Sequence, residues 1–388
     1  MFESHIAFTV IPDSSEAGTY LGSRIDAALA SHPADAAIVF ASTRYELKKL
    51  LEAFHARCKP KVIIGCSSAG EFVSEQQGEG AATVLALCSD EIKFSVGVGA
   101  GLRKNRLEAA KALASSFSPL EDPAFPHRSL LILTDALAGY VDDFLEHFTL
   151  QTAGRYQLVG GGAGDDGKYL ETYVFEGTNV HRDAAVGLEI LSKKPIGIGA
   201  QHGWKLGGSP MRVTEAIGNR IISLNATPII DVFKTHARNA CQVFDVSNPL
   251  PFFLRTALAV ETGSSHKIRV PLQLHEDSII FAAEIPVGVT VQLATITPQS
   301  SLEATMVAIR SAHEQLGGLK PKIAFLFDCI GTRLRAGMAY PSDLEKVRQA
   351  LGAETMLVGF NTYGQVARIA GQFTDFHNST GVVCLIPE

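Results

Sequence analysis

The sequence predicts an α/β to α+β fold with two related domains, built from duplicated β–α–β modules and antiparallel hairpins. Apolar runs that read as buried strands alternate with helical patterns and glycine-rich turns in three separate places. Shorter strand-like runs between them are separated by Gly, Asn and Pro, as in hairpins. Of the 388 residues, 46% are hydrophobic and 19% are charged, which supplies a substantial core and argues against long disordered segments.

The clearest sign of duplication is a segment that occurs twice. V-I-I-G-C-S-S-A-G-E-F fills residues 62–72, and M-L-V-G-F-N-T-Y-G-Q-V fills residues 356–366. Each copy has three apolar residues, a glycine, small polar residues, and a second glycine followed by Glu71 or Gln365. This pattern indicates a buried strand that ends in a glycine turn with exposed amides and hydroxyls. Open α/β sheets usually place ligand sites at such carboxyl ends of strands.

Each copy closes a β–α–β module, and a third, weaker module ends in Q-L-V-G-G-G at residues 157–162. The first strands and the helices fall at 37–40 and 45–57, at 130–133 and 140–150, and at 323–327 and 342–351. The first strands end in polar pairs, which are Ser42-Thr43, Thr134-Asp135 and Asp328-Cys329. We therefore expect the polar tips of the three modules to converge on one crevice.

The stretch from 193 to 208 is rich in Gly, Pro and Lys and predicts a domain boundary. The expected domains are therefore residues 1–200 and residues 201–388. Strand-like runs at 170–175 and 185–191 flank Gly, Thr and Asn, so we expect them to pair as a hairpin.

Charge and cysteine usage exclude several classes of protein. The net charge is −6 with no basic run, so nucleic acid is not an expected partner. The chain begins without a secretory signal pattern, and no apolar stretch reaches the roughly 18–20 residues of a membrane helix. The six cysteines are scattered singly, without C-x-x-C spacing, which favours reduced thiols in a cytoplasmic protein and no structural zinc site.

Several strings, taken together, resemble the FIST family of sensory proteins. They fall in the family's order across roughly residues 35–385, over both its amino-terminal and carboxyl-terminal domains. Besides residues 62–72, they are L-V-G-G-G-A-G-D-D-G at 158–167, V-H-R-D-A-A-V-G-L at 180–188, G-W-K-L-G at 203–207, R-V-T-E-A-I-G-N at 212–219, F-D-C-I-G-T-R at 327–333, G-F-N-T-Y-G-Q at 359–365 and F-H-N-S-T at 376–380. Gln365 departs from the family, which usually has Glu there.

The resemblance implies a cytoplasmic sensor that binds a small ligand between its domains. Because no kinase, cyclase or chemoreceptor pattern is fused to it, we expect it to signal to a separate partner, such as a histidine kinase or a cyclic-di-GMP enzyme. Within the family, amino acids or similar metabolites are one class of ligand. Haem, with nitric oxide as the sensed gas, is the ligand of a subgroup.

The glycine turns supply the candidate ligand contacts, through amides, hydroxyls and acids. The candidates are Gly65, Cys66, Ser67, Ser68, Gly70, Glu71, Asp165, Asp166, Asn361, Thr362 and Gly364. In the alternative interpretation both turns only close a sheet edge, with Glu71 capping a backbone donor. The string at 162–167 matches G-x-G-x-x-G, but a strand-like run follows where a dinucleotide site needs a helix. Asp165 and Asp166 would then bind a ligand amine or a cation, or only form the turn.

Two further hypotheses concern single residues. His236 shares a helix face with Val232 and Phe233 and is a haem candidate, since a neutral imidazole on an apolar wall suits proximal iron; a hydrogen-bonded core histidine is the alternative. An enzyme with Cys66 or Cys329 as its nucleophile is the rival class of function, although the spacing in G-C-S-S-A-G does not fit a nucleophile elbow. No catalytic residue and no metal ligand is assigned.

Overall fold

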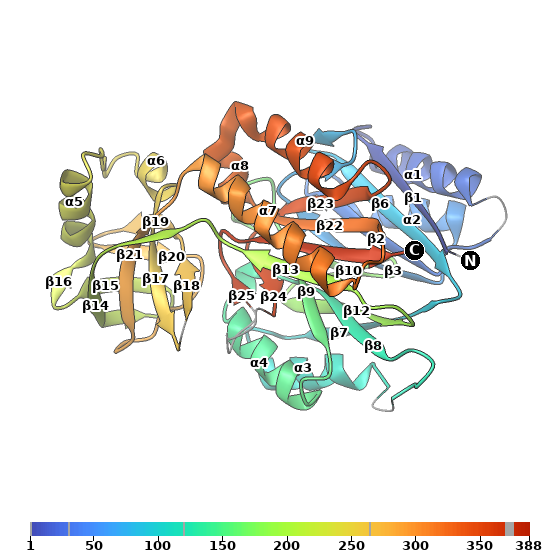
Figure 1. The fold of residues 1–388 in the computed structure, drawn as a ribbon, viewed down its shortest axis with the longest axis horizontal. Helices are drawn as coiled ribbons and strands as arrows, with labels where there is room; N and C mark the ends of the chain where they lie inside the picture. The colour runs from blue at the N-terminus through green and yellow to red at the C-terminus, as the bar shows by residue number, and fades with distance from the viewer. Residues whose placement is uncertain (1, 30–31, 119–120, 264, 369–375) are drawn as a thin grey trace.

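The computed structural model describes residues 2–29, 32–118, 121–263, 265–368 and 376–388. They form three six-stranded mixed sheets around one apolar centre, and a fourth sheet that projects to one side (Figure 1). No helix in these ranges is both long enough and apolar enough to cross a membrane.

The first sheet contains the first predicted module. Its strands, in spatial order, are β1 (Phe2–Thr9), β6 (Ala82–Ser89), β2 (Ala36–Ser42), β3 (Val62–Ser68), β10 (Val174–Glu176) and β11 (Asn179–His181). Only β2 and β3 run parallel, and helix α2 (Leu47–Cys58) connects them. Helix α2 packs with α1 (Ser14–Ala28) over the outer face of the sheet, where Leu21, Leu50 and Phe54 are fully buried.

The second sheet repeats this plan. Its strands are β7 (Ile92–Ala100), β12 (Ala184–Ser192), β8 (His127–Thr134), β9 (Gln157–Gly162), β24 (Gln365–Ala367) and β25 (Phe376–His377). The parallel pair β8 and β9 is joined through η1 (Ala136–Ala138) and α4 (Val141–Gln151), and α3 (Arg106–Ser115) packs beside α4. The side chain of Asn105 caps the first turn of α3 by accepting from the Glu108 amide.

The third sheet has the same order again. Its strands are β13 (Gly197–Gln201), β26 (Gly381–Pro387), β22 (Pro321–Cys329), β23 (Met356–Thr362), β4 (Glu71–Val73) and β5 (Gln77–Gly78). The parallel pair β22 and β23 is joined through α8 (Ile330–Ala336), η2 (Gly337–Ala339) and α9 (Tyr340–Leu351). Helix α7 (Pro298–Gln315) lies against β13 and β26, and it begins at a capping box formed by Thr297 and Ser300.

The three modules exchange strands in a closed cycle. After β3 the chain adds β4 to the third sheet, after β23 it adds β24 to the second, and after β9 it adds β10 to the first. The strand after each module thus completes the sheet of another module. The structure therefore has an internal pseudo-threefold repeat. Each six-stranded sheet is mixed because it joins one parallel pair of strands to antiparallel neighbours.

A glycine lies at the same place in each exchange. A Cβ atom on Gly65, Gly160 or Gly359 would come within 2.0, 2.0 and 2.1 Å of a carbonyl oxygen on the adjacent parallel strand. Opposite these glycines the incoming strands place Phe175, Val366 and Phe72, respectively. Only a residue without a side chain leaves room for this approach, so the repeated glycine is explained by packing.

The inner faces of the three sheets share one core. Its residues include Ile38, Phe40, Ile64, Cys66, Leu131, Leu133, Val159, Phe325, Phe327, Val358 and Phe360. The rings of Phe40 and Phe360, from the first and third sheets, lie 4.4 Å apart between centroids. Because helices cover the outer faces, the central strands are buried on both sides, which is why they appear in the sequence as unbroken apolar runs.

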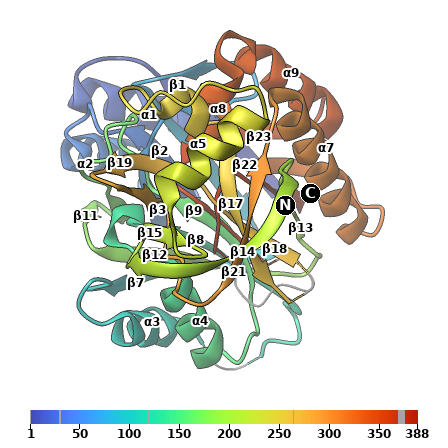
Figure 2. The ribbon, with the colours of Figure 1, turned by 90° about the vertical axis from the view of Figure 1, so that its left-hand side faces the viewer.

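The fourth sheet interrupts the third repeat between β13 and α7. Its strands are β18 (Ser265–Arg269), β17 (Thr256–Thr262), β21 (Thr290–Thr295), β14 (Lys205–Ile217), β15 (Arg220–Leu224), β20 (Ser278–Phe281) and β19 (Pro271–His275), with β16 (Thr227–Pro228) beside β15. Helix α5 (Ile229–Asn239) lies in front of this sheet in Figure 2, and the short α6 (Leu250–Phe253) completes the unit. A separate apolar cluster, centred on Phe233, Phe253 and Phe281, holds α5 and α6 to the sheet.

The mixed α/β prediction is confirmed, and all three predicted modules are present. The predicted hairpin of 170–175 with 185–191 is wrong: β10 pairs with β3 and β11, whereas β12 pairs with β7 and β8. The fully buried β12 finds a longer partner on each side than the three-residue β10 offers. The division into residues 1–200 and 201–388 stays a prediction; its boundary falls within β13, and β4 and β24 pair across it.

We predict that Gly160→Ala destabilises the protein much more than Gly101→Ala. Both glycines have positive φ, 145° and 80°, but a Cβ atom on Gly101 has nothing within 4 Å. Gly101→Ala is expected to lower the free energy of unfolding by about 1 kcal/mol, and Gly160→Ala by about 3 kcal/mol or more, because the sheet must open around the added methyl group. Urea denaturation measures both losses, and equal losses would contradict the packing role of Gly160.

Candidate functional site

The three glycine corners meet at one place, which we call the hub and define as residues 67–71, 162–166 and 361–365. The amide of Ala69 donates to the Asn361 carbonyl at 3.0 Å, and the amide of Asn361 donates to the Gly70 carbonyl at 2.8 Å. The third corner joins them through the amides of Gly162 and Gly164, which donate to the carbonyls of Gly364 and Ser67 at 2.9 Å each. The corners from the two ends of the chain are thus in direct contact.

Glu71 and Gln365 do the same structural work in two of the repeats. The Ser68 hydroxyl donates to Glu71 Oε1, and the Ala81 amide donates to Oε2 at 3.0 Å. In the matching contacts, Gln365 Nε2 donates to the Thr362 hydroxyl at 2.6 Å, and the Thr380 amide donates to Gln365 Oε1 at 3.1 Å. Glu71 therefore caps a backbone donor, and the same cap is made at Gln365 without a carboxylate.

Burial raises the pKa of Glu71 to about 8, although its two hydrogen bonds oppose the shift. Desolvation disfavours the charged form of the acid, and here it outweighs the opposing effect of the Arg333 charge. Near neutral pH this carboxyl group is thus mainly protonated and uncharged, like an amide. This is the reason that Gln can fill the equivalent position.

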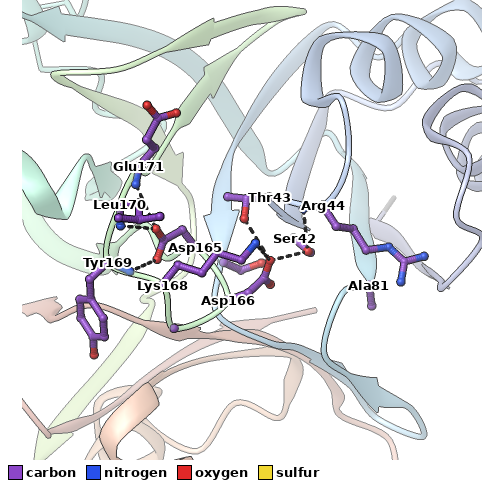
Figure 3. A network of polar contacts seen from close by, with 12 residues as sticks. Ser42, Thr43, Arg44, Ala81, Asp165, Asp166, Lys168, Tyr169, Leu170 and Glu171 are labelled. Carbon is purple, nitrogen blue, oxygen red and sulfur yellow. Dashed lines mark hydrogen bonds and ion pairs between the residues drawn. The ribbon is translucent and has the colours of Figure 1, made fainter.

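Asp165 holds the loop that follows β9 (Figure 3). Its carboxylate accepts from the amides of Tyr169, Leu170 and Glu171 at 2.7, 2.6 and 3.0 Å, and from the Tyr363 hydroxyl. These contacts keep Tyr169 at a φ of 55°, a conformation that non-glycine residues rarely adopt. Asp165 is therefore a loop anchor whose oxygens are engaged by the protein itself.

Asp166 ties the second repeat to the first. Its Oδ2 accepts from the hydroxyls of Ser42 and Thr43 at 2.9 and 3.0 Å, and Lys168 Nζ lies 3.6 Å away (Figure 3). Of the three predicted polar ends, the one at Ser42 and Thr43 is joined here to the segment after β9.

A largely covered arginine, Arg333, lies beside the hub on α8. Its side chain is 14% exposed, and its Nη1 lies 2.6 Å from Oε1 of Glu79, whose side chain is 74% exposed. Arg333 Nε has no hydrogen-bond partner among the described residues. The guanidinium approaches Gly70 so closely that a Cβ atom there would be 2.8 Å from Nη1. One solvent-facing carboxylate is thus its ion-pair partner, and part of its donor capacity is unused.

Two cavities meet at Arg333 and Glu79. The first, of about 290 Å³, is lined by Glu71, Phe72, Gln77, Gly78, Glu79, Arg333, Gly337, Tyr340, Pro341 and Asn361. The second, of about 360 Å³, lies between the hub and the fourth sheet. Its hub side carries Asp166, Gly167, Tyr169, Cys329 and Arg333, and its fourth-sheet side is apolar. A ligand in the second cavity would touch both parts of the molecule.

A second arginine, Arg335, connects the fourth-sheet unit to the rest of the molecule. It donates to the Leu254 carbonyl at 2.7 Å, to the Ser379 hydroxyl at 3.0 Å and to the Ser301 hydroxyl at 3.3 Å, and its guanidinium lies 5.5 Å from the Trp204 ring centroid. All of these partners are uncharged. Burial accordingly lowers the pKa of Arg335, and its charge adds positive potential to the second cavity, which it also lines.

A buried acid, Asp328, interacts electrostatically with Arg335. It accepts from the Tyr340 hydroxyl at 2.9 Å, and Tyr340 in turn accepts from Asn361 Nδ2 at 2.8 Å. Burial raises the pKa of Asp328 to about 6, so its carboxylate balances the arginine charge only above that pH.

Most of the predicted ligand residues therefore lie at the hub, while three do not. Gly65 lies within β3, and Cys66 points into the common core. His236 is on α5 in the fourth-sheet unit, 6.3 Å from Phe252 between ring centroids. Sequence reasoning missed Arg333, Tyr169 and Glu79, although Arg333 ends the string F-D-C-I-G-T-R. No local pattern shows that an arginine one turn into a helix faces a glycine of another repeat.

The two thiols proposed as nucleophiles are both buried. Burial raises the pKa of Cys66 well above its usual value, and it also raises the pKa of Cys329. Cys329 Sγ accepts from the Gly331 amide at 3.4 Å and lines the second cavity. Across the part of the chain that the structure describes, no group of three or more His, Cys, Asp or Glu residues is placed to hold a metal ion.

Comparisons with known proteins agree with the resemblance. Residues 35–227 match the family model described as the FIST N domain, and residues 238–368 match the one described as the FIST C domain. No curated protein matches the chain. Among solved structures, a cyanuric acid hydrolase from A. caulinodans aligns with 99% of this chain and 98% of its own, at 8% identity and a TM-score of 0.30. A likeness at that level carries no argument about activity.

We predict that the wild type loses stability as pH rises and that the Glu71→Gln variant does not show this loss. A carboxyl whose pKa is raised in the folded state stabilises the fold below its unfolded pKa, and this contribution is lost as pH rises through about 8. Between about pH 5 and pH 8 the free energy of unfolding of the wild type should fall by about 3 kcal/mol more than that of Glu71→Gln. Denaturation series at several pH values measure the difference.

The twin position gives the matched control. Gln365→Glu places a second buried carboxyl in the equivalent cap and is expected to steepen the pH dependence. If Glu71→Gln keeps the full pH dependence of the wild type, the cap does not depend on a protonated carboxyl.

Proposed function

The chain belongs to the FIST family, whose domains are associated with sensory signal transduction, and on that premise we propose a cytoplasmic sensor that binds a small anionic ligand at Arg333. The observation that carries the proposal is the Arg333 guanidinium at the junction of two cavities, whose ion-pair partner among the described residues is the exposed carboxylate of Glu79. Six unpaired cysteines suit a reducing compartment.

A carboxylate is the ligand group that this arrangement favours. Guanidinium groups bind carboxylates through hydrogen bonds and charge, and Arg333 Nη1 lies 2.6 Å from a carboxylate oxygen in this structure. Glu79 already presents a carboxylate to Nη1 from the solvent side. A ligand carboxylate would replace Glu79, and amino acids and related metabolites carry such a group.

Signalling would follow from the position of the second cavity. Its walls belong to the hub on one side and to the fourth-sheet unit on the other. A ligand that touches both has different affinities for their closed and open arrangements, and only such a difference shifts a conformational population. The output would pass to a separate protein, for which a histidine kinase or a cyclic-di-GMP enzyme is our proposal from the family.

A haem-based sensor is a second candidate, favoured by one observation. Burial lowers the pKa of His236, and its Nε2 has no hydrogen-bond partner among the described residues. Both properties fit a neutral imidazole that could hold iron. Haem, when bound, would supply the metal that takes up nitric oxide. His236 packs on Phe252 and lines neither cavity at Arg333, so this candidate uses a different part of the molecule.

An enzyme with a cysteine nucleophile has less support. The thiolate is the reactive form of cysteine, and burial raises the pKa of both Cys66 and Cys329. Cys329 accepts a hydrogen bond from a backbone amide, and Cys66 lies in the apolar core. Among the described residues, neither thiol has a hydrogen bond to a side chain that could act as a general base.

We predict that an anionic metabolite stabilises the wild type against heat and that Arg333→Gln abolishes the effect. At a ligand concentration of about 100 Kd the expected gain is about 2.7 kcal/mol. Arg57→Gln, which removes an arginine from the outer helix α2, is the control and should respond like the wild type. Glu79→Gln removes the competing carboxylate and should tighten ligand binding several-fold.

A thermal-shift screen of amino acids and organic acids measures these responses. If no anionic compound stabilises the wild type, or if Arg333→Gln responds as the wild type does, the anion site is refuted.

We predict that haem, if it is the cofactor, gives a Soret band after expression with added haem, and that His236→Ala loses it. The absorption spectrum of the freshly purified protein measures this. His202→Ala, a second histidine whose pKa burial lowers, is the matched control and should keep the band. A colourless protein that a metabolite stabilises would refute the haem candidate.

A further inference from the structure

Tyr169 forms a flat surface at the second cavity. Its ring stacks on that of Tyr363, with centroids 4.3 Å apart and an interplanar angle of 8°. Tyr169 is nonetheless 39% exposed and lines the cavity. Since Tyr363 covers one face of the ring, the exposed surface of Tyr169 lies on its other face and its edges. An aromatic ring that lines a cavity and is partly exposed offers a stacking surface for another ring.

The hub fixes this surface in place. The Tyr363 hydroxyl donates to Asp165 and accepts from the Gly167 amide at 2.9 Å. Asp165 also binds the Tyr169 amide, and Tyr169 is held at positive φ. In Figure 3 the ring extends away from the Asp165 carboxylate. A strained residue that its surroundings hold in one conformation is typical of a ligand site. Its side chain is already ordered, so ligand binding costs less conformational entropy.

The opposite side of the cavity is apolar. It is lined from α6 and the residue after it, and from the start of β19 and the residue before it, by Leu250, Phe253, Leu254, Val270, Pro271 and Leu272. The body of a ligand between this side and Tyr169 must therefore be apolar.

The charges around the cavity favour one anionic group on that body. Arg333 and Arg335 both line it, and the acids that line it are Asp166 and Glu79. Asp166 is engaged by Ser42, Thr43 and Lys168, and Glu79 reaches Arg333 from solvent. The ion pair with Glu79 shows that the Arg333 guanidinium binds a carboxylate.

We propose that the cavity selects a planar aromatic carboxylate, with its ring stacked on Tyr169 and its carboxylate on Arg333. This inference rests on the proposed anion site and adds the shape of the ligand to it. An aliphatic carboxylate of equal size would keep the ion pair and lose the stacking, so the two classes of ligand differ in affinity by the stacking contribution alone.

Three probes of matched size test the proposal on the full chain: 2-naphthoate, decahydro-2-naphthoate and 2-naphthamide. Their dissociation constants are measured by titration calorimetry on the wild type, Tyr169→Leu, Tyr169→Phe and Arg333→Gln. We expect the wild type to bind 2-naphthoate about two- to tenfold more tightly than decahydro-2-naphthoate. Tyr169→Phe should keep this preference, Tyr169→Leu should abolish it, and 2-naphthamide should bind weakly to all four proteins.

The outcomes separate this inference from the function on which it rests. If both carboxylates bind equally well and both depend on Arg333, the anion site stands and the aromatic selection is overturned. If Tyr169→Leu keeps the preference, the stacking surface is elsewhere and the proposal is overturned. If neither carboxylate binds the wild type, the anion site and the aromatic selection are overturned together.

Discussion

The structure depends on one packing constraint, which is the close approach of strands at Gly65, Gly160 and Gly359. At each of these positions a Cβ atom would be about 2 Å from a neighbouring carbonyl oxygen, and the strand opposite comes from another module. Each module therefore completes a sheet that begins elsewhere in the chain. The three sheets cannot separate without breaking these pairings, so the hub is a rigid centre held by backbone hydrogen bonds.

The fourth-sheet unit is attached to this centre by polar contacts of a different kind. Asp142 at the start of α4 pairs with Lys267 and Arg269 of β18, and Arg335 bridges to Leu254. The second cavity lies along the same junction. A centre held by exchanged strands and a unit joined to it by directional polar contacts form a suitable arrangement for a sensor, since a bound ligand can add contacts to one relative pose.

The hub also shows why charge is used sparingly at the centre of the molecule. Glu71 and Gln365 make equivalent caps, and burial shifts the carboxyl toward its uncharged form. Asp165 keeps its interactions through three amides and a hydroxyl. Arg333 and Arg335 lie at the cavities, where Arg333 pairs with the exposed Glu79 and Arg335 donates to uncharged groups, and this contrast separates the groups that build the hub from those available to a ligand.

The sequence by itself determined the central strands and the connecting helices of the three modules, because burial on both faces makes a central strand an unbroken apolar run. It also placed Ser67, Asp166 and Asn361 near one another, since strand ends of parallel pairs share an edge. The tertiary structure alone decided that β10 joins β3, that Asp165 anchors a loop, and that Arg333 and Tyr169 line one cavity. Strand pairing and side-chain direction depend on contacts between residues far apart in the chain, which local periodicity does not encode.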